Sequence, residues 1–185
     1  PQSIEVTYGG PLENPMGPLS AAALKGLLGH FLSGARVNLV NGLLLAKERG
    51  IEVAATLRSE MPVYTDLIEL KLRTAKGERS VAGTFIHNEE PRIVRIDQFS
   101  VDAVPEGYML VITNDDRPGM IGSIGTLLGK HRINIAGMQL GRTRKNDKAV
   151  AILALDDSIP DEVMEEIRAI PNIFEDGSSK DVRIL

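Results

Sequence analysis

Apolar residues recur at two spacings along the first half of the chain, at every second position in some segments and at helical spacing in others. Helical spacing predicts helices over residues 19–32 and 38–49, and the second of them ends at Gly50, a frequent helix stop. Short apolar or alternating runs bounded by turn residues predict strands. These strands cover residues 4–8, 52–57, 67–73, 80–86 and 92–96.

The second half shows a regular order of elements: strand, helix, strand, strand, helix and strand. They cover residues 108–114, 118–129, 133–142, 147–155, 160–169 and 173–184. This βαββαβ order is typical of the ferredoxin-like fold. Residues 101–107 contain Pro105 and Gly107 and are interpreted as the link between the halves. We therefore expect an α+β protein, with an N-terminal α+β domain over residues 1–103 and a ferredoxin-like domain over residues 104–185.

The most informative segment is the polar loop over residues 114–119, between a predicted strand and the following helix. Asp116 can cap that helix, and Pro118 suits its first turn because no amide hydrogen is needed there. The helix is therefore predicted to start near Arg117 and to end near Gly129.

The start of this helix is a candidate binding site for a free amino acid. Its first amides have no helical partner and lie at the positive end of the helix dipole, so they can hold a carboxylate. These amides belong to Gly119, Met120 and Ile121. The side chains of Asn114, Asp116 and Asn134 could hold an ammonium or a hydroxyl group. The alternative is an ordinary capped helix without a ligand.

Composition and charge narrow the classes of partner. The 185 residues carry a formal net charge of -4, which argues against nucleic acid or an anionic membrane as the main partner. No apolar run reaches the roughly 18 residues of a membrane helix, and no cationic leader precedes an apolar segment. The absence of cysteine excludes disulfides and thiolate chemistry and favours a cytoplasmic setting. Because the chain enters a predicted strand almost directly after Pro1, we expect a piece of a longer protein.

No catalytic or metal-binding pattern stands out in the sequence. His30, His87 and His131 have none of the short spacings of metal ligands. Two carboxylate pairs, at residues 89–90 and 156–157, fall at predicted turns and are interpreted as solvated charges. We therefore assign neither catalytic nor metal-binding residues.

The glycines of the helix 118–129 match no nucleotide-binding motif. Gly119, Gly122, Gly125 and Gly129 lack the single-residue gap of the dinucleotide pattern, and the glycine-lysine segment at their end is one residue short of a phosphate-binding loop. At about 100° per residue they share one side of the helix. They are interpreted as allowing close packing on the sheet or on a second copy of the chain.

Two arginines near the end of the first half form a second candidate site. Arg92 and Arg95 flank two apolar residues on a predicted strand, and guanidinium groups suit phosphate and other anions. We consider an anion site for a substrate or for a phosphate-bearing effector. The alternative is a solvated basic surface balanced by nearby glutamates, to which Lys47 and Arg49 would also belong.

The same residues resemble a known family. One segment resembles the start of an ACT domain, a βαββαβ module that senses amino acids. It covers residues 109–142, MLVITNDDRPGMIGSIGTLLGKHRINIAGMQLGR. Within that family the stretch most resembles the C-terminal domain of bacterial D-3-phosphoglycerate dehydrogenase, the first enzyme of the phosphorylated route to L-serine. Upstream segments resemble the intervening, or allosteric substrate-binding, domain of that dehydrogenase. They are IEVTYGG at 4–10, LKGLLG at 24–29, VNLVNGLLLAKERGI at 37–51 and VAGTFIHNEEPRIVRID at 81–97.

The resemblance implies a regulatory region without cofactor or catalytic residues of its own, because the family's catalytic and NAD-binding groups lie in preceding domains. We expect NAD and an oxidoreductase activity in the parent chain. The implied effector is L-serine, bound where two ACT domains pair edge to edge across a two-fold axis, for feedback inhibition. A homodimer or tetramer through the ACT and intervening domains is also implied.

The implied effector site uses the residues already singled out. Asn114 and Asp116 match the two polar side chains ahead of the family's Pro-Gly, and Asn134 matches the asparagine that opens the second strand. The amides near Gly119, Met120 and Ile121 would meet the carboxylate. Position 114 is often a larger His, Tyr or Arg in related sensors, so the short Asn leaves the identity of the effector open.

Other functions remain as alternatives. The ACT pair could serve assembly alone, without binding an amino acid. A similar intervening domain also occurs in some iron–sulfur L-serine dehydratases, so the region could regulate a lyase. A stand-alone enzyme is a further alternative.

Overall fold

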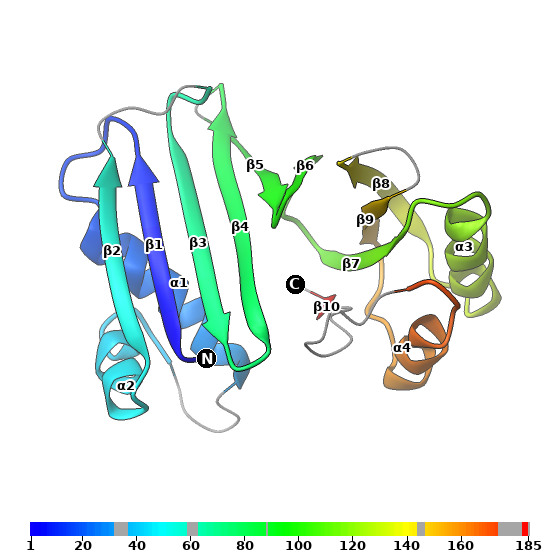
Figure 1. Ribbon diagram of the computed structural model, residues 1–185, viewed down its shortest axis with the longest axis horizontal. Coiled ribbons are helices and arrows are strands. Elements are labelled where there is room, and N and C mark those ends of the chain that lie inside the picture. The colour runs from blue at the N-terminus through cyan, green and yellow to red at the C-terminus, as the bar shows by residue number, and fades with distance from the viewer. Residues whose placement is uncertain (32–36, 59–62, 88, 144–146, 174–182, 185) are drawn as a thin grey trace. The chain divides into compact units, whose positions relative to one another are not determined.

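The structure is a computed structural model that describes residues 1–31, 37–58, 63–87, 89–143, 147–173 and 183–184 (Figure 1). The chain forms two compact units, Pro1–Glu90 and Pro91–Leu185. Each unit has its own buried apolar core and combines helices with strands, which confirms the predicted α+β class.

The first unit is built on four strands. They are β1 (Ser3–Gly9), β2 (Glu52–Arg58), β3 (Leu67–Thr74) and β4 (Gly77–Ile86). Their order in this unit is β2-β1-β3-β4, so β2 lies at the edge. β1 pairs in parallel with β2 and antiparallel with β3, and β3 pairs antiparallel with β4.

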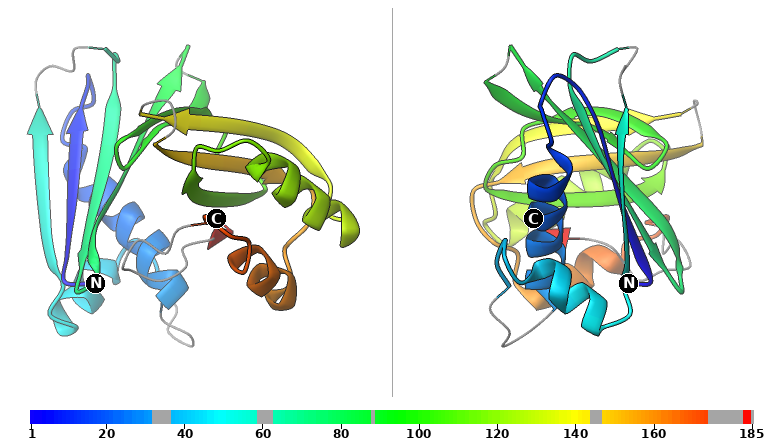
Figure 2. Two further views of the ribbon diagram at one scale, coloured as in Figure 1. Left: turned by 45° about the vertical axis from the view of Figure 1, so that its right-hand side comes forward. Right: turned by 90° about the vertical axis from the view of Figure 1, so that its left-hand side faces the viewer.

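Two helices, α1 (Met16–Phe31) and α2 (Gly42–Glu48), connect β1 to β2. A parallel pair of strands needs such a crossover. Both helices cover the same face of the sheet (Figure 2). Ile4 and Val6 of β1 face them and are buried with Leu24 of α1 in the core of this unit. Because side chains alternate along a strand, the intervening residues of β1 point to the helix-free face.

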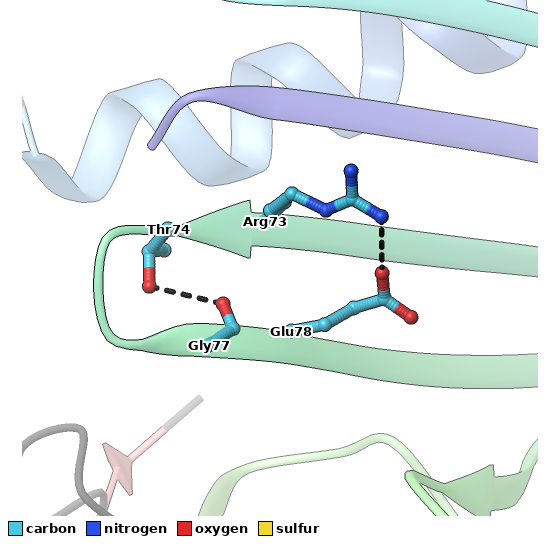
Figure 3. A network of polar contacts seen from close by, with 4 residues as sticks. All are labelled: Arg73, Thr74, Gly77 and Glu78. Carbon is cyan, nitrogen blue, oxygen red and sulfur yellow. Dashed lines mark hydrogen bonds and ion pairs between the residues drawn. The ribbon is translucent and has the colours of Figure 1, made fainter.

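The antiparallel strands β3 and β4 form a hairpin with a short turn. The guanidinium of Arg73 lies 3.0 Å from a carboxylate oxygen of Glu78 on the facing strand (Figure 3). In the turn, the Thr74 hydroxyl donates a hydrogen bond to the Gly77 carbonyl at 3.2 Å. These contacts join the last two residue pairs of the strands, Arg73 with Glu78 and Thr74 with Gly77.

The second unit begins with a pair of antiparallel strands, β5 (Glu90–Ile96) and β6 (Phe99–Ala103). The predicted link over residues 101–107 is therefore wrong for residues 101–103, which belong to β6. Phe99 and Ala103 are buried, and these apolar residues hold the segment against the unit instead of leaving it as a linker. The domain boundary at 103/104 stays a prediction, while the compact units of the structure divide between Glu90 and Pro91.

The rest of the second unit follows the predicted βαββαβ order. Its elements are β7 (Tyr108–Asp115), α3 (Met120–Lys130), β8 (Ile135–Arg142), β9 (Lys148–Leu155), α4 (Asp161–Arg168) and β10 (Arg183–Ile184). The strand order is β10-β7-β9-β8, so β8 lies at an edge. Of the last predicted strand, over residues 173–184, Ile173 forms a bridge with Asn114 and residues 183–184 pair with β7. The remainder of that prediction lies outside the described residues.

Helices α3 and α4 pack on one face of this sheet. Ile124 and Leu128 of α3 and Ile167 of α4 are buried against Leu110 of β7 and Leu153 of β9. On the opposite face, β6 approaches the end of β8 closely. A Cβ added at Gly141 would lie 2.8 Å from the carbonyl oxygen of Ser100, so only glycine fits there without a shift.

No helix within the described ranges combines the length and the apolar character needed to cross a bilayer.

Candidate effector site in the second unit

The loop between β7 and α3 has a geometry that differs from the predicted capped helix. The helix begins at Met120 and not near Arg117, and Gly119 precedes it with a φ of 93°, in the left-handed region. No side chain caps the helix, so the predicted cap by Asp116 is wrong. Glycine adopts left-handed backbone dihedrals without strain because it has no Cβ. Gly119 therefore allows the chain to turn into the helix at this position.

Asp116 has other partners in place of the helix. Its backbone amide donates a 2.7 Å hydrogen bond to the carbonyl of Asp147. Its carboxylate lies 3.5 Å from the guanidinium of Arg142 at the end of β8. The neighbouring Asp115 carboxylate lies 3.4 Å from Arg117. The two carboxylates of the loop thus each lie close to a largely exposed guanidinium group, Arg117 of the loop or Arg142 of β8.

The amides of Gly119, Met120 and Ile121 remain a predicted anion site, since the structure shows only the hydrogen bonds around them. The first helical hydrogen bond runs from the Ser123 amide to the Gly119 carbonyl at 2.9 Å. The amides of Ile121 and Gly122 precede that bond. Met120 is buried, and its amide reaches the Arg117 carbonyl only at 3.5 Å. Such amides at a helix start attract a carboxylate.

Asn114 is the buried polar residue of the site, with 3% of its surface exposed. Its amide nitrogen donates a 2.6 Å hydrogen bond to the carbonyl of Asp115. Its side-chain oxygen Oδ1 is buried and has no hydrogen-bond partner among the residues that the structure describes. A buried polar atom without a partner costs about 1–3 kcal/mol, so this acceptor is expected to meet a donor in the working protein.

Asn134 does not join this group within one copy of the chain. Asn114 lies opposite Ala149 of β9, whereas Ile135, the next residue after Asn134, lies opposite Leu155. Six residues of strand separate these two positions on β9, which is about 20 Å. Asn134 therefore lies at the opposite end of the sheet from Asn114 and Asp116, and the three side chains cannot bind one small ligand together in a single copy.

At its own end of the sheet, Asn134 is exposed and bonded to an acidic loop. Its amide nitrogen donates a 2.7 Å hydrogen bond to the carboxylate of Asp156, and the Asp156 amide donates to the Asn134 carbonyl at 3.3 Å. Within the described ranges no donor meets its side-chain oxygen, which can therefore accept a hydrogen bond.

The edge strand β8 carries exposed apolar side chains beside these polar groups. Met138 is 39% exposed and Leu140 is 56% exposed. Both lie opposite residues of β9 that face the helices, Leu153 and Ala151, so they share the face covered by α3 and α4. Large exposed apolar residues on an edge strand are typical of an interface.

The glycines of α3 line an exposed side of the helix. A Cβ added at Gly119, Gly122, Gly125 or Gly129 would meet no atom within 4 Å. The interpretation that these glycines pack the helix closely on the sheet is therefore wrong, because Met120, Ile124 and Leu128 form the buried side of α3. Packing on a second copy stays a prediction.

Sequence reasoning did not detect the polar cluster that joins α3 to α4. The Lys130 ammonium donates a 3.2 Å hydrogen bond to Glu166, and His131 Nε2 lies 3.0 Å from the other oxygen of that carboxylate. The hydrogen bond from Lys130 is the main cause that lowers the pKa of Glu166. Lys130 and Glu166 are far apart in sequence, so no local pattern signals this cluster.

The arginine pair of the second candidate site lies on β5. The Arg92 guanidinium is 3.2 Å from the Asp102 carboxylate of β6 and also donates to the Pro91 carbonyl at 3.2 Å. Arg95 lies opposite Ser100 in the same strand pair. The ion pair lowers the positive charge that Arg92 can offer an anion, and the anion site remains a prediction.

A cavity of about 300 Å³ opens on the helix-free face of the first unit's sheet. Its charged lining residues are Glu5, Glu52, Lys71, Arg73 and Glu78. Three carboxylates against two cations give no clear preference for an anion or a cation. Among the described residues, no group of three or more histidines and carboxylates is placed to hold a metal ion.

Comparison with known proteins defines the class of both units. Residues 1–97 match the family described as D-3-phosphoglycerate dehydrogenase intervening domain, and residues 108–172 match the ACT domain family. The fold and the loop geometry described above thus belong to a two-domain regulatory region. The chain belongs to the D-3-phosphoglycerate dehydrogenase family and corresponds to its C-terminal regulatory region.

Individual relatives agree with this assignment. The chain is 42% identical to a D-3-phosphoglycerate dehydrogenase of Synechocystis, over 84% of this chain and 28% of that protein. It is 39% identical to one of Methanocaldococcus jannaschii, over 98% of this chain and 33% of the relative. It is 36% identical to the D-3-phosphoglycerate dehydrogenase of Bacillus subtilis, over 80% of this chain and 29% of that protein. The chain thus spans no more than about a third of the length of these relatives.

Proposed function

We propose that this chain is the L-serine sensor of a D-3-phosphoglycerate dehydrogenase and that bound serine inhibits the parent enzyme. The observation that supports this most is the buried Oδ1 of Asn114, which has no hydrogen-bond partner within the described part of the chain. An ammonium donor would satisfy that acceptor, and the helix amides next to it suit a carboxylate. The two groups together favour an α-amino acid.

L-serine can use each polar group of the loop. Its carboxylate would accept from the amides of Ile121 and Gly122, with the exposed Arg142 as a second source of positive charge. Its ammonium would donate to Asn114 Oδ1 and to the Asp116 carboxylate, whose present partner Arg142 lies 3.5 Å away. Its hydroxyl would then need a further partner.

A second copy can supply that partner through β8. In an antiparallel pairing of two β8 strands across a two-fold axis, the first residues of one strand lie opposite the last residues of the other. Asn134 precedes β8 and Arg142 ends it. Asn134 of the second copy would therefore approach the loop that contains Asn114 and Asp116. The ligand site would be complete only at the interface, and the exposed Met138 and Leu140 would be covered there.

Feedback inhibition follows if serine binds one arrangement of the two copies better than another. A ligand shifts a conformational equilibrium only by its difference in affinity between the states. Coupling of about 1–3 kcal/mol is typical and would suffice to reduce the activity of a distant catalytic site. This region contributes no catalytic group, and the NAD-dependent oxidation is proposed for the parent chain. A cytoplasmic setting is proposed because the chain is free of cysteine.

Calorimetric titration of the chain with L-serine tests the proposal, with glycine and D-serine as competitors. Asp116→Ala should abolish or strongly weaken binding, because it removes the carboxylate that meets the ammonium. Glu106→Ala is the matched control, since Glu106 is an exposed carboxylate of the same unit outside the loop. Stereoselective binding lost only in Asp116→Ala supports the sensor, whereas equal behaviour of the two variants contradicts the site.

A second candidate function is assembly without an effector. It is favoured by the fact that Asp116 is paired with Arg142 and Asn134 with Asp156, so two of the polar groups already have partners. A folded, dimeric chain that binds no amino acid in the titration would support assembly alone.

A further inference from the structure

The outer edge of the first unit's sheet is open along a whole strand. β2 is the last strand in the order β2-β1-β3-β4 and pairs only with β1 within the described residues. All of its residues are exposed except Val53, which is half-buried. An edge strand presents unpaired N–H and C=O groups that a further strand can satisfy.

β2 lacks the devices that usually block such an edge. It contains neither proline nor lysine, and its register with β1 runs without a bulge from Ser3 opposite Glu52 to Gly9 opposite Arg58. Its charged residues stand only at its two ends, Glu52 and Arg58. A regular, unblocked edge of 7 residues is long enough for a full ladder with another strand.

The sequence of β2 is complementary to itself when two copies run antiparallel about Ala55. The facing pairs are Glu52 with Arg58, Val53 with Leu57, Ala54 with Thr56, and Ala55 with Ala55 of the second copy. Opposite charges and apolar pairs at facing positions stabilise antiparallel strands. At the centre, two alanines leave room for a close approach.

Charge complementarity identifies a second copy as the occupant. Within the described part of the chain, neither the Glu52 nor the Arg58 side chain has an ion-pair partner. A two-fold axis through the Ala55 pair would create two Glu52–Arg58 contacts, one at each end. A shift of the register by two residues would lose both of them, so the charges also fix the alignment.

Exposed apolar residues lie beside the same edge. Leu57 is 55% exposed, and Val53 of a second copy would lie opposite to it. α2, which packs against α1 and β2, adds Leu43 at 47% and Leu44 at 58% exposure on the helix-covered face. A two-fold axis perpendicular to the sheet would keep the helices of both copies on one face.

We propose that β2 is a self-pairing interface, through which two copies of the chain join their first-unit sheets antiparallel about Ala55. This interface is separate from the proposed effector site and does not require an amino acid. A two-fold contact of this kind is closed, because the same surface is used by both partners. Together with pairing through β8, it would give the chain two different self-complementary edges.

Cross-linking through a single cysteine tests the interface directly, because the chain has no cysteine of its own. In Ala55→Cys the thiols of two paired copies would face each other. Ala75→Cys is the control, since Ala75 is exposed in the turn between β3 and β4. With a short bis-maleimide, we expect covalent dimer to form at least tenfold faster in Ala55→Cys. Equal rates would overturn the proposal and would leave β2 to another segment of a longer protein.

Exchange of the end charges tests the register. In the Ala55→Cys background, Glu52→Arg or Arg58→Glu alone would place like charges opposite each other and should slow cross-linking about fivefold or more. The double exchange restores opposite charges and should return the rate to within about twofold of the parent. A double variant as slow as the single ones would overturn the pairing about Ala55. Circular dichroism of each variant confirms that the exposed substitutions leave the fold intact.

Discussion

The carboxylate of Asp116 and the guanidinium of Arg142 lie 3.5 Å apart and connect the loop before α3 to the last residue of the edge strand β8. The loop is the candidate effector site, and the strand is the edge available for a second copy. The Arg142 side chain is 64% exposed, so the ion pair itself stabilises the fold little. Its importance lies in linking a ligand-binding group to an interface.

Arg142→Ala should weaken L-serine binding without unfolding the chain. The substitution removes a positive charge beside the expected carboxylate and removes one ion-pair partner of Asp116. We expect a loss of about 3–10-fold in affinity and a change below about 1 kcal/mol in the free energy of unfolding, as for exposed ion pairs. Calorimetry and urea denaturation measure the two quantities. Arg73→Ala, which removes an exposed ion pair of the first unit, should leave the affinity unchanged. Equal losses in both variants would contradict the role of Arg142.

Gly141→Ala should destabilise the second unit by about 1–3 kcal/mol, because inserting a carbon into a tightly packed place forces the neighbours to move. Its Cβ would lie 2.8 Å from the Ser100 carbonyl and 2.9 Å from a methyl group of Val150. Gly137→Ala on the same strand is the matched control, since its Cβ would meet only Ala154 at 4.0 Å. Urea denaturation followed by circular dichroism measures the free energy of unfolding of both variants. An unchanged free energy of unfolding in Gly141→Ala would show that β6 does not pack on β8 in solution.

Most elements of the fold could be predicted from the sequence because their apolar patterns are local. Alternation of apolar residues predicts which side of β1 faces the helices, and helical spacing predicts which side of α3 is buried. The start of α3 was predicted three residues too early, since Asp116 in sequence looks like a cap. Its distant partners, Asp147 and Arg142, and the left-handed Gly119 decide the geometry instead, and neither is visible in a local pattern.

The candidate site could be predicted in residue type but not in arrangement. Asn114 and Asp116 lie together at one end of the sheet, as expected from their closeness in sequence. Asn134 lies at the other end, because β8 runs parallel to β7 and starts where β7 starts. Strand register depends on long-range pairing, so a set of polar residues alone could not show that the site is divided between two ends.

Glu166→Gln should lower stability at neutral pH and have no effect in acid. The hydrogen bond from Lys130, followed by the nearby charges of Lys130 and His131, lowers the pKa of the Glu166 carboxyl in the folded chain. A lowered folded-state pKa means that stabilisation is fully present above the unfolded value of about 4.5 and is lost as the pH falls through the folded value. The effect should be small because the carboxylate is exposed. Urea midpoints of both proteins between pH 3 and pH 7 should converge only at the acid end, and a constant difference would contradict this assignment.

A site shared between two copies predicts complementation between two damaged chains. Asn114→Ala and Asn134→Ala should each lose L-serine binding, because every site of a homodimer then lacks one partner. In a mixed dimer, one site would contain both substitutions and the other would contain none. Since the two sites of a two-fold dimer are equivalent, a purified mixed dimer should regain tight binding at about one site per dimer. Differently tagged chains, refolded together and purified through both tags, allow this stoichiometry to be measured by calorimetry. A mixed dimer without any tight site would show that Asn134 does not complete the effector site across the interface.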